Sequence, residues 1–231
     1  TNTSNIGGQQ EVAKQTGKGG DSSTNVGGTP QYDGTYFFGG AGMDGGYIDD
    51  MAAAMGEAGI SDVHAVDGER WSMNSGIDAA IGVLALNEEV DLGNRVHTTP
   101  ERLINKGDGE GQFNLVGYSY GALVTAQVAM TRVKKGGTVD NLVLIGAPIA
   151  KSFLTTLRAT KGIRNVIVKD LTRHGDTIRA GMSGWDVIRS APQLGYQMTQ
   201  GSGHFYYAPN NQTGMNRRRQ LAKDLYDGGL R

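Results

Sequence analysis

The chain has 231 residues and a formal net charge of −1, with 22 basic and 23 acidic side chains. This balance gives no field of one sign that would indicate binding to nucleic acid or to an anionic membrane surface. The absence of cysteine excludes disulfides, thiol catalysis and cysteine-ligated zinc, and the apolar runs, such as 142–145, are far too short to span a bilayer.

Residues 1–31 are rich in Gly, Ser, Thr, Asn and Gln and contain few apolar side chains. Such a segment cannot bury enough surface to offset the entropy lost on ordering. We therefore expect a flexible linker over 1–31 and a folded domain over 32–231. The sequence begins without an initiator methionine or a charged-then-apolar leader, so we expect a domain carried at the C-terminal end of a larger protein.

From residue 34 onward, short apolar runs alternate with segments of helical character. Strands are expected at 34–38, 62–66, 113–116, 141–145 and 165–169, and helices at 47–57, 77–89, 122 to about 134, 150–160 and 214–226. This alternation predicts an α/β fold with a mainly parallel sheet and helices on both faces. In such sheets the reactive groups gather beyond the carboxyl ends of the strands.

A Gly-x-Ser-x-Gly pentapeptide, Gly117-Tyr-Ser-Tyr-Gly121, stands between the strand predicted at 113–116 and the helix that follows. The order strand, tight turn, helix is what a nucleophile elbow requires, with Ser119 at the apex of a strained turn. The two glycines would leave room for strand and helix to pack together. The alternative is an ordinary strand-to-helix connection whose serine only caps the helix.

A serine hydroxyl becomes nucleophilic only when a base takes its proton, and a third group orients that base. Of the four histidines, His204 lies in a glycine-hinged turn late in the chain, which fits the order Ser, Asp, His expected with this elbow. We therefore predict His204 as the base. His64 falls inside a predicted strand, where a core histidine is more typical, His97 precedes the serine, and His174 adjoins the candidate acids.

Two aspartates follow the strand predicted at 165–169 and qualify as the acid. Asp176 stands farther out on the loop, where it can reach a histidine from another loop, so it is preferred. Asp170 abuts the strand end and could instead cap the turn.

Acyl transfer also needs donors for the developing oxyanion. We predict the backbone N–H of Tyr120 and that of Gly40 or Ala41, in the glycine loop after the first strand. The alternatives for this loop are an ordinary glycine turn or a phosphate-binding loop. No Gly-Lys-Ser/Thr follows, and the glycine spacing is not that of a dinucleotide site.

Three other features of the sequence bear on the function. The Met- and aromatic-containing segment 182–198 could line an acyl groove or form a lid, or be the core of a covering helix. The run Arg217-Arg-Arg219 could meet lipid phosphates, but a solvated basic face is the preferred interpretation. The acidic residues between 44 and 50 have no histidine spaced to complete a metal site, so we predict no metal, and no cofactor.

These elements resemble the α/β-hydrolase superfamily over about residues 34–230. The specific parts are Gly117-Tyr-Ser-Tyr-Gly121, Gly175-Asp-Thr-Ile178 and Gly203-His-Phe205. The resemblance implies a catalytic domain over 32–231 that hydrolyses an ester, or less often an amide or thioester, through a seryl acyl-enzyme. By position, Ser119 resembles the nucleophile, Asp176 the acid and His204 the base. Phe38 departs from the pattern, because many members carry His there.

The run Phe37-Phe-Gly-Gly-Ala-Gly42, with a low-complexity segment ahead of a small hydrolase, also resembles the Gly-x-Ser-x-Gly lipase effectors of bacterial secretion systems. That resemblance implies secretion or delivery as the C-terminal domain of a larger bacterial protein. It also implies lipid or phospholipid acyl esters as substrates and an immunity protein that blocks the active site as a partner. The alternatives are a small-ester or thioester hydrolase and a catalytically silent scaffold used for binding. Neither a nucleic-acid partner nor a transmembrane segment is expected.

Overall fold

A computed structural model describes residues 33–40, 46–66, 87, 111–176, 178–182 and 202–231, and the structural statements below concern these residues. The predicted linker 1–31, most of the predicted helix 77–89, His97, Ala41 and most of the segment 182–198 lie outside them.

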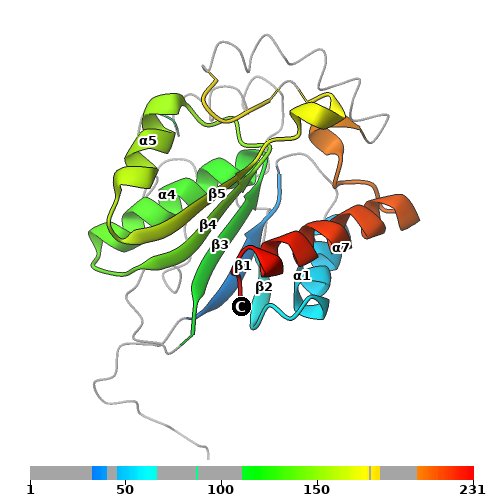
Figure 1. Ribbon diagram of the computed structural model, residues 1–231, viewed down its shortest axis with the longest axis horizontal. Coiled ribbons are helices and arrows are strands. Elements are labelled where there is room, and N and C mark those ends of the chain that lie inside the picture. The colour runs from blue at the N-terminus through cyan, green and yellow to red at the C-terminus, as the bar shows by residue number, and fades with distance from the viewer. Residues whose placement is uncertain (1–32, 41–45, 67–86, 88–110, 177, 183–201) are drawn as a thin grey trace, which may run out of the picture.

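A five-stranded sheet with the order β2-β1-β3-β4-β5 forms the centre of the described fold (Figure 1). Every neighbouring pair is parallel, which confirms the prediction of an α/β fold with a parallel sheet. The order reverses between β1 and β3, and in open α/β sheets ligands bind beyond the carboxyl ends of the strands at such a switch point. The strands are β1 Gly34–Phe38, β2 Val63–Val66, β3 Phe113–Tyr118, β4 Val139–Ile145 and β5 Ile163–Lys169.

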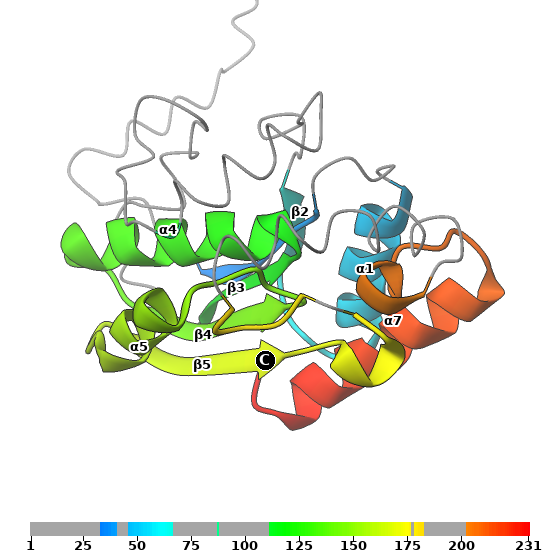
Figure 2. The same ribbon diagram turned by 90° about the horizontal axis from the view of Figure 1, so that it is seen from above.

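Helices cover both faces of the sheet, as the alternating pattern predicts. In Figure 2, α4 lies on one side of the sheet and α7 on the other. The apolar side chains of α4 and α5 share one buried cluster, and those of α1 and α7 share a second. These helices are α1 Gly46–Glu57, α4 Tyr120–Lys134, α5 Lys151–Ala159 and α7 Gln212–Asp227, with single 3₁₀ turns η3 Thr172–His174 and η4 Gly203–Phe205.

The central strand β3 is buried along its whole length. Because successive side chains of a strand point to opposite faces, Leu115 joins the cluster under α4 while Val116 and Tyr118 join the cluster under α1 and α7. The strand runs two residues farther than predicted, so Tyr118 ends β3 and Ser119 follows it directly. The turn at Ser119 therefore begins directly at the end of a fully buried strand.

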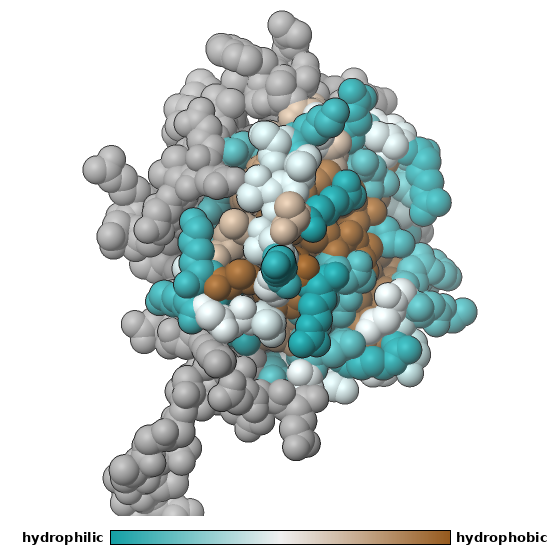
Figure 3. Space-filling view, turned by 60° about the vertical axis from the view of Figure 1, so that its left-hand side comes forward, coloured by the Kyte–Doolittle hydropathy of each residue, from teal (hydrophilic) through white to brown (hydrophobic). Residues whose placement is uncertain are grey.

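The outer strands are less covered. On β2, the side chain of His64 is 44% exposed and pairs with Asp62 at 2.7 Å, so the expectation of a core histidine is wrong. The physical reason is that β2 pairs only with β1 among the described strands. On the other edge, the apolar side chains of Val166, Ile167 and Val168 on β5 are half-buried. Figure 3 shows one face of the molecule, on which apolar side chains are visible between hydrophilic ones.

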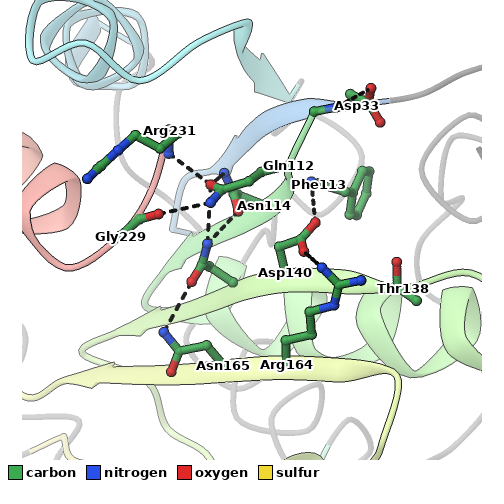
Figure 4. A network of polar contacts seen from close by, with 12 residues as sticks. Asp33, Gln112, Phe113, Asn114, Thr138, Asp140, Arg164, Asn165, Gly229 and Arg231 are labelled. Atoms are coloured by element: carbon green, nitrogen blue, oxygen red, sulfur yellow. Dashed lines mark hydrogen bonds and ion pairs between the residues drawn. The ribbon is translucent and has the colours of Figure 1, made fainter. Parts of the chain in front are cut away.

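An asparagine ladder, Asn114, Asn141 and Asn165, crosses β3, β4 and β5 near their amino ends (Figure 4). Asn165 Nδ2 donates to Asn141 Oδ1 at 3.1 Å, and Asn141 Nδ2 donates to Asn114 Oδ1 at 2.8 Å. Asn114 Nδ2 then donates to Thr35 Oγ1 on β1 at 3.0 Å. The ladder thus links four strands at the end of the sheet opposite to the pentapeptide.

None of the described helices combines the length and the apolar character needed to cross a bilayer.

Candidate active site

Ser119 occupies a strained turn between β3 and α4. Its backbone has φ 58° and ψ −126°, a conformation that side-chain-bearing residues rarely adopt. Holding a residue there costs about 1–3 kcal/mol and requires support from its surroundings. The support includes a hydrogen bond of 2.8 Å from the Ser119 N–H to the carbonyl of Ile145, at the end of β4.

The two glycines of the pentapeptide are places where the backbone has no room for a side chain. A Cβ on Gly117 would lie 2.5 Å from Ala122 Cα, in the first turn of α4. A Cβ on Gly121 would lie 2.3 Å from the carbonyl oxygen of Gly39, in the loop after β1. Gly117 thus lets α4 pack onto β3, and Gly121 lets the loop after β1 approach the same turn.

Ser119, His204 and Asp176 form one buried chain of hydrogen bonds. Ser119 Oγ lies 2.5 Å from His204 Nε2, and His204 Nδ1 lies 2.9 Å from Asp176 Oδ2. The three residues are 9%, 4% and 5% exposed. A neutral imidazole that donates from Nδ1 to the carboxylate leaves Nε2 to accept the serine proton. This arrangement can activate a serine hydroxyl as a nucleophile.

The structure separates the two candidate acids. Asp176 uses Oδ2 for His204, while its Oδ1 accepts the backbone N–H of Ile178 at 2.8 Å, which fixes the carboxylate. Asp170 instead accepts the backbone N–H of Ala180 at 2.9 Å, ten residues farther along the chain. Asp176 is therefore the aspartate that the fold brings to the histidine.

Gly146, directly after β4, lies against the Asp176–His204 pair. Its φ is 52°, and a Cβ there would lie 3.4 Å from Asp176 Oδ2 and 3.5 Å from His204 Nδ1. A side chain at this position would be strained by the positive φ, and its Cβ would be in ordinary van der Waals contact with the pair. The sequence analysis missed Gly146, although its place at the end of the strand predicted at 141–145 is the signal that points to it.

Side chains from β3 and α7 hold the segment that carries His204. The hydroxyl of Tyr118 donates to the backbone carbonyl of His204. Arg217 Nη1 donates to the carbonyl of Tyr206 at 2.9 Å, and its guanidinium lies 4.0 Å from the centre of that ring. His174, beside the acid, stacks on the same ring with centroids 3.7 Å apart. The acid and base segments are therefore joined outside the hydrogen-bonded chain as well.

Arg218 is a further anchor of this segment and is almost fully buried. It is 1% exposed, its Nε lies 2.5 Å from Asp50 Oδ2 on α1, and its Nη1 donates to the carbonyls of Tyr207 and Pro209 at 2.6 and 3.0 Å. The expectation of a solvated basic face at 217–219 is thus wrong for Arg218. The cause is that this turn of α7 faces α1 and the His204 segment, and Asp50 neutralises the buried charge.

The predicted oxyanion donors differ in their surroundings. Tyr120 opens α4 directly after Ser119, and the first N–H groups of a helix point out of its N-terminus. The N–H of Gly40 donates to the hydroxyl of Tyr47 at 2.8 Å. Burial raises the pKa of Tyr47 well above its usual value, so its hydroxyl remains neutral and able to accept this bond. Ala41 lies outside the described residues.

No family model and no curated protein matches this chain. Within the described part of the chain, no three His, Cys, Asp or Glu side chains gather in a way that could hold a metal ion.

Proposed function

We propose that this protein is a serine hydrolase that cleaves carboxylic esters through an acyl-enzyme. The observation that carries the proposal is the buried chain Ser119–His204–Asp176, built on a strained strand-to-helix turn. This geometry supports an active-site reading of the serine over a plain helix cap, because Ser119 makes no side-chain cap hydrogen bond to α4.

The reaction then follows from the positions of the groups. His204 Nε2 takes the Ser119 proton as Oγ attacks the ester carbonyl, and the Tyr120 N–H donates to the oxyanion of the tetrahedral intermediate. His204 returns that proton to the departing alkoxide, which leaves an acyl group on Ser119. Water attacks the acyl group by the same steps and releases the carboxylic acid. Asp176 orients the imidazole and stabilises its cationic form.

The arrangement of the described elements also supports an α/β-hydrolase fold as part of the proposal. Ser119 follows the central strand β3, Asp176 follows β5, and His204 comes last. Ala147, Ile149, Ile178 and Met182 share a buried apolar cluster with Tyr120, the residue after the serine. An apolar cluster that includes this residue is compatible with an acyl chain as the bound group, so lipid or phospholipid acyl esters are the substrates that we propose.

The test compares the wild type with Ser119→Ala and with Ser152→Ala, an exposed serine on α5 that serves as a matched control. Substrates are short- and long-chain acyl esters and phospholipid vesicles, and a fluorophosphonate probe reports the activated serine. We expect Ser119→Ala to lose about three or more orders of magnitude in kcat/KM, and Ser152→Ala to lose nothing.

Higher activity on vesicles than on dissolved short esters would support the lipid substrate, and the reverse would support a small-ester hydrolase. Hydrolysis that survives in Ser119→Ala would rule out the mechanism. A folded wild type that neither hydrolyses these substrates nor reacts with the probe would favour a silent binding scaffold.

A further inference from the structure

Two neighbouring residues of the pentapeptide contact the same histidine. Ser119 Oγ bonds the imidazole of His204, and the hydroxyl of Tyr118 donates to the backbone carbonyl of His204. The side chain and the main chain of the base are thus both held from one end of β3. The distance between Ser119 Oγ and the His204 imidazole therefore depends on two hydrogen bonds that start from adjacent residues of the chain.

The geometry points to Tyr118 as a positioning residue that fixes His204 relative to Ser119. This inference rests on the proposed function, because it assigns a role within the same site. Tyr118 itself does not touch the reacting atoms and acts through the histidine.

Tyr118 can serve as a rigid support because strand pairing holds its backbone and neighbouring rings pack against its side chain. Its backbone ends β3 in register with Ile145 of β4, and its side chain is fully buried. Its ring lies edge-on to Tyr47 and to Tyr207, with centroids 5.9 and 6.1 Å apart. A long side chain held in this way has no other rotamer available without displacing its neighbours.

The hydroxyl of Tyr118 also stays in its donating form. Burial raises the pKa of Tyr118 well above its usual value, and the nearby Tyr47, Asp176 and Tyr207 raise it further. A backbone hydrogen bond from Tyr207 acts in the opposite direction without cancelling these effects.

The remaining anchors act farther from the ring of the base. Arg218 holds the carbonyls of Tyr207 and Pro209, three and five positions after His204. That clamp places the segment on α1 and α7, whereas the Tyr118 hydroxyl binds the peptide unit of His204 itself. Tyr118 therefore places the imidazole, whereas Arg218 attaches the whole segment to α1 and α7.

The first test is Tyr118→Phe, which keeps the ring and removes only the hydroxyl. Because small misplacements of a catalytic group are costly, we expect kcat to fall on the order of 10- to 100-fold with KM unchanged. The matched control is Tyr36→Phe, since the Tyr36 hydroxyl donates to the carbonyl of Asp33 at 3.1 Å at the other end of the sheet. The control should leave kcat and KM unchanged. A folded Tyr118→Phe protein with wild-type kcat would overturn the inference.

A second measurement does not depend on catalysis. In protein labelled with ¹⁵N-histidine, the ring nitrogen signals of His204 should change in Tyr118→Phe and stay unchanged in Tyr36→Phe. If the wild type proves inactive, the proposed function fails, but these signals still decide whether Tyr118 positions the imidazole. Unchanged His204 signals in Tyr118→Phe would contradict the positioning role.

If Tyr118→Phe does not fold, the wild type supplies the answer. With ¹³Cζ-labelled tyrosine, the isotope shift in mixed H₂O and D₂O reports how fast each hydroxyl proton exchanges. The Tyr118 hydroxyl, identified by its contact with His204, should exchange slowly because it is buried and bonded. Rapid exchange would show that the bond to His204 is not maintained and would overturn the inference.

Discussion

The two ends of the sheet carry buried polar networks of opposite character. At the amino ends, the asparagine ladder consists of neutral amides on regular strands, each donating to the next. At the carboxyl ends, the chain Ser119–His204–Asp176 contains two titratable groups and a residue with positive φ. Both networks satisfy their buried polar atoms. Only the second combines strain with groups that can exchange a proton, a combination that is typical of functional sites.

The comparison predicts that the negative charge of Asp176, at the carboxyl ends of the strands, is needed for the proposed catalysis. Asp176→Asn keeps the shape of the side chain but removes the negative charge and favours the wrong tautomer of His204. We expect kcat to fall by about 10⁴-fold, as in other triads that lose this carboxylate. Asp170→Asn is the control and should change kcat little, because an amide oxygen can still accept the N–H of Ala180. Steady-state kinetics on one ester would decide, and equal losses in both variants would contradict the assignment of the acid.

A second prediction concerns the close approach of two main chains, those of Gly121 and Gly39, at the carboxyl ends of the strands. In Gly121→Ala the new Cβ would meet the Gly39 carbonyl at 2.3 Å, and two main chains cannot separate without disturbing β1 and β3. We expect a loss of about 3 kcal/mol in the free energy of unfolding. Gly56→Ala on α1 is the control, since a Cβ there would have no atom within 4 Å apart from its chain neighbours and the backbone of its own helix. Alanine at this position should stabilise the helix by up to about 1 kcal/mol. Urea denaturation measures both, and a neutral Gly121→Ala would refute the close approach.

The smallest effect is expected at the amino end. Asn141→Ala removes the middle of the ladder and leaves polar atoms of Asn114 and Asn165 without their partner, at a cost of about 1–3 kcal/mol. Asn165→Ala, at the exposed end, should cost less because water replaces the lost bond. Neither change should alter kcat. A loss of activity in folded Asn141→Ala would show that the two ends are coupled and would break the comparison.

Local patterns in the sequence were enough to predict the strands, most helices and the three residues that the structure brings together at the site. Each depends on short-range information: an apolar run, a glycine-flanked serine, and the chain order Ser, Asp, His. The catalytic roles of these residues remain predictions.

Contacts between distant segments could not be predicted in this way. Tyr118 meets a residue 86 positions away, and Arg218 pairs with Asp50 across 168 positions. The asparagine ladder depends on the register of three strands, which composition does not encode. His64 was misjudged for a related reason: an apolar alternation predicts a strand but does not say whether that strand lies at the edge of its sheet.

The backbone of Ser119 also bears on what a mutation at this position would do. A glycine at this position would adopt φ 58° without strain, so it would relieve the cost of about 1–3 kcal/mol that a side chain incurs there. Mutation to glycine would relieve this strain, but it would also remove the hydroxyl that bonds the buried His204 Nε2, at a comparable cost of about 1–3 kcal/mol. The strained backbone and the contact with His204 thus go together, which fits the nucleophilic role that we propose for Ser119.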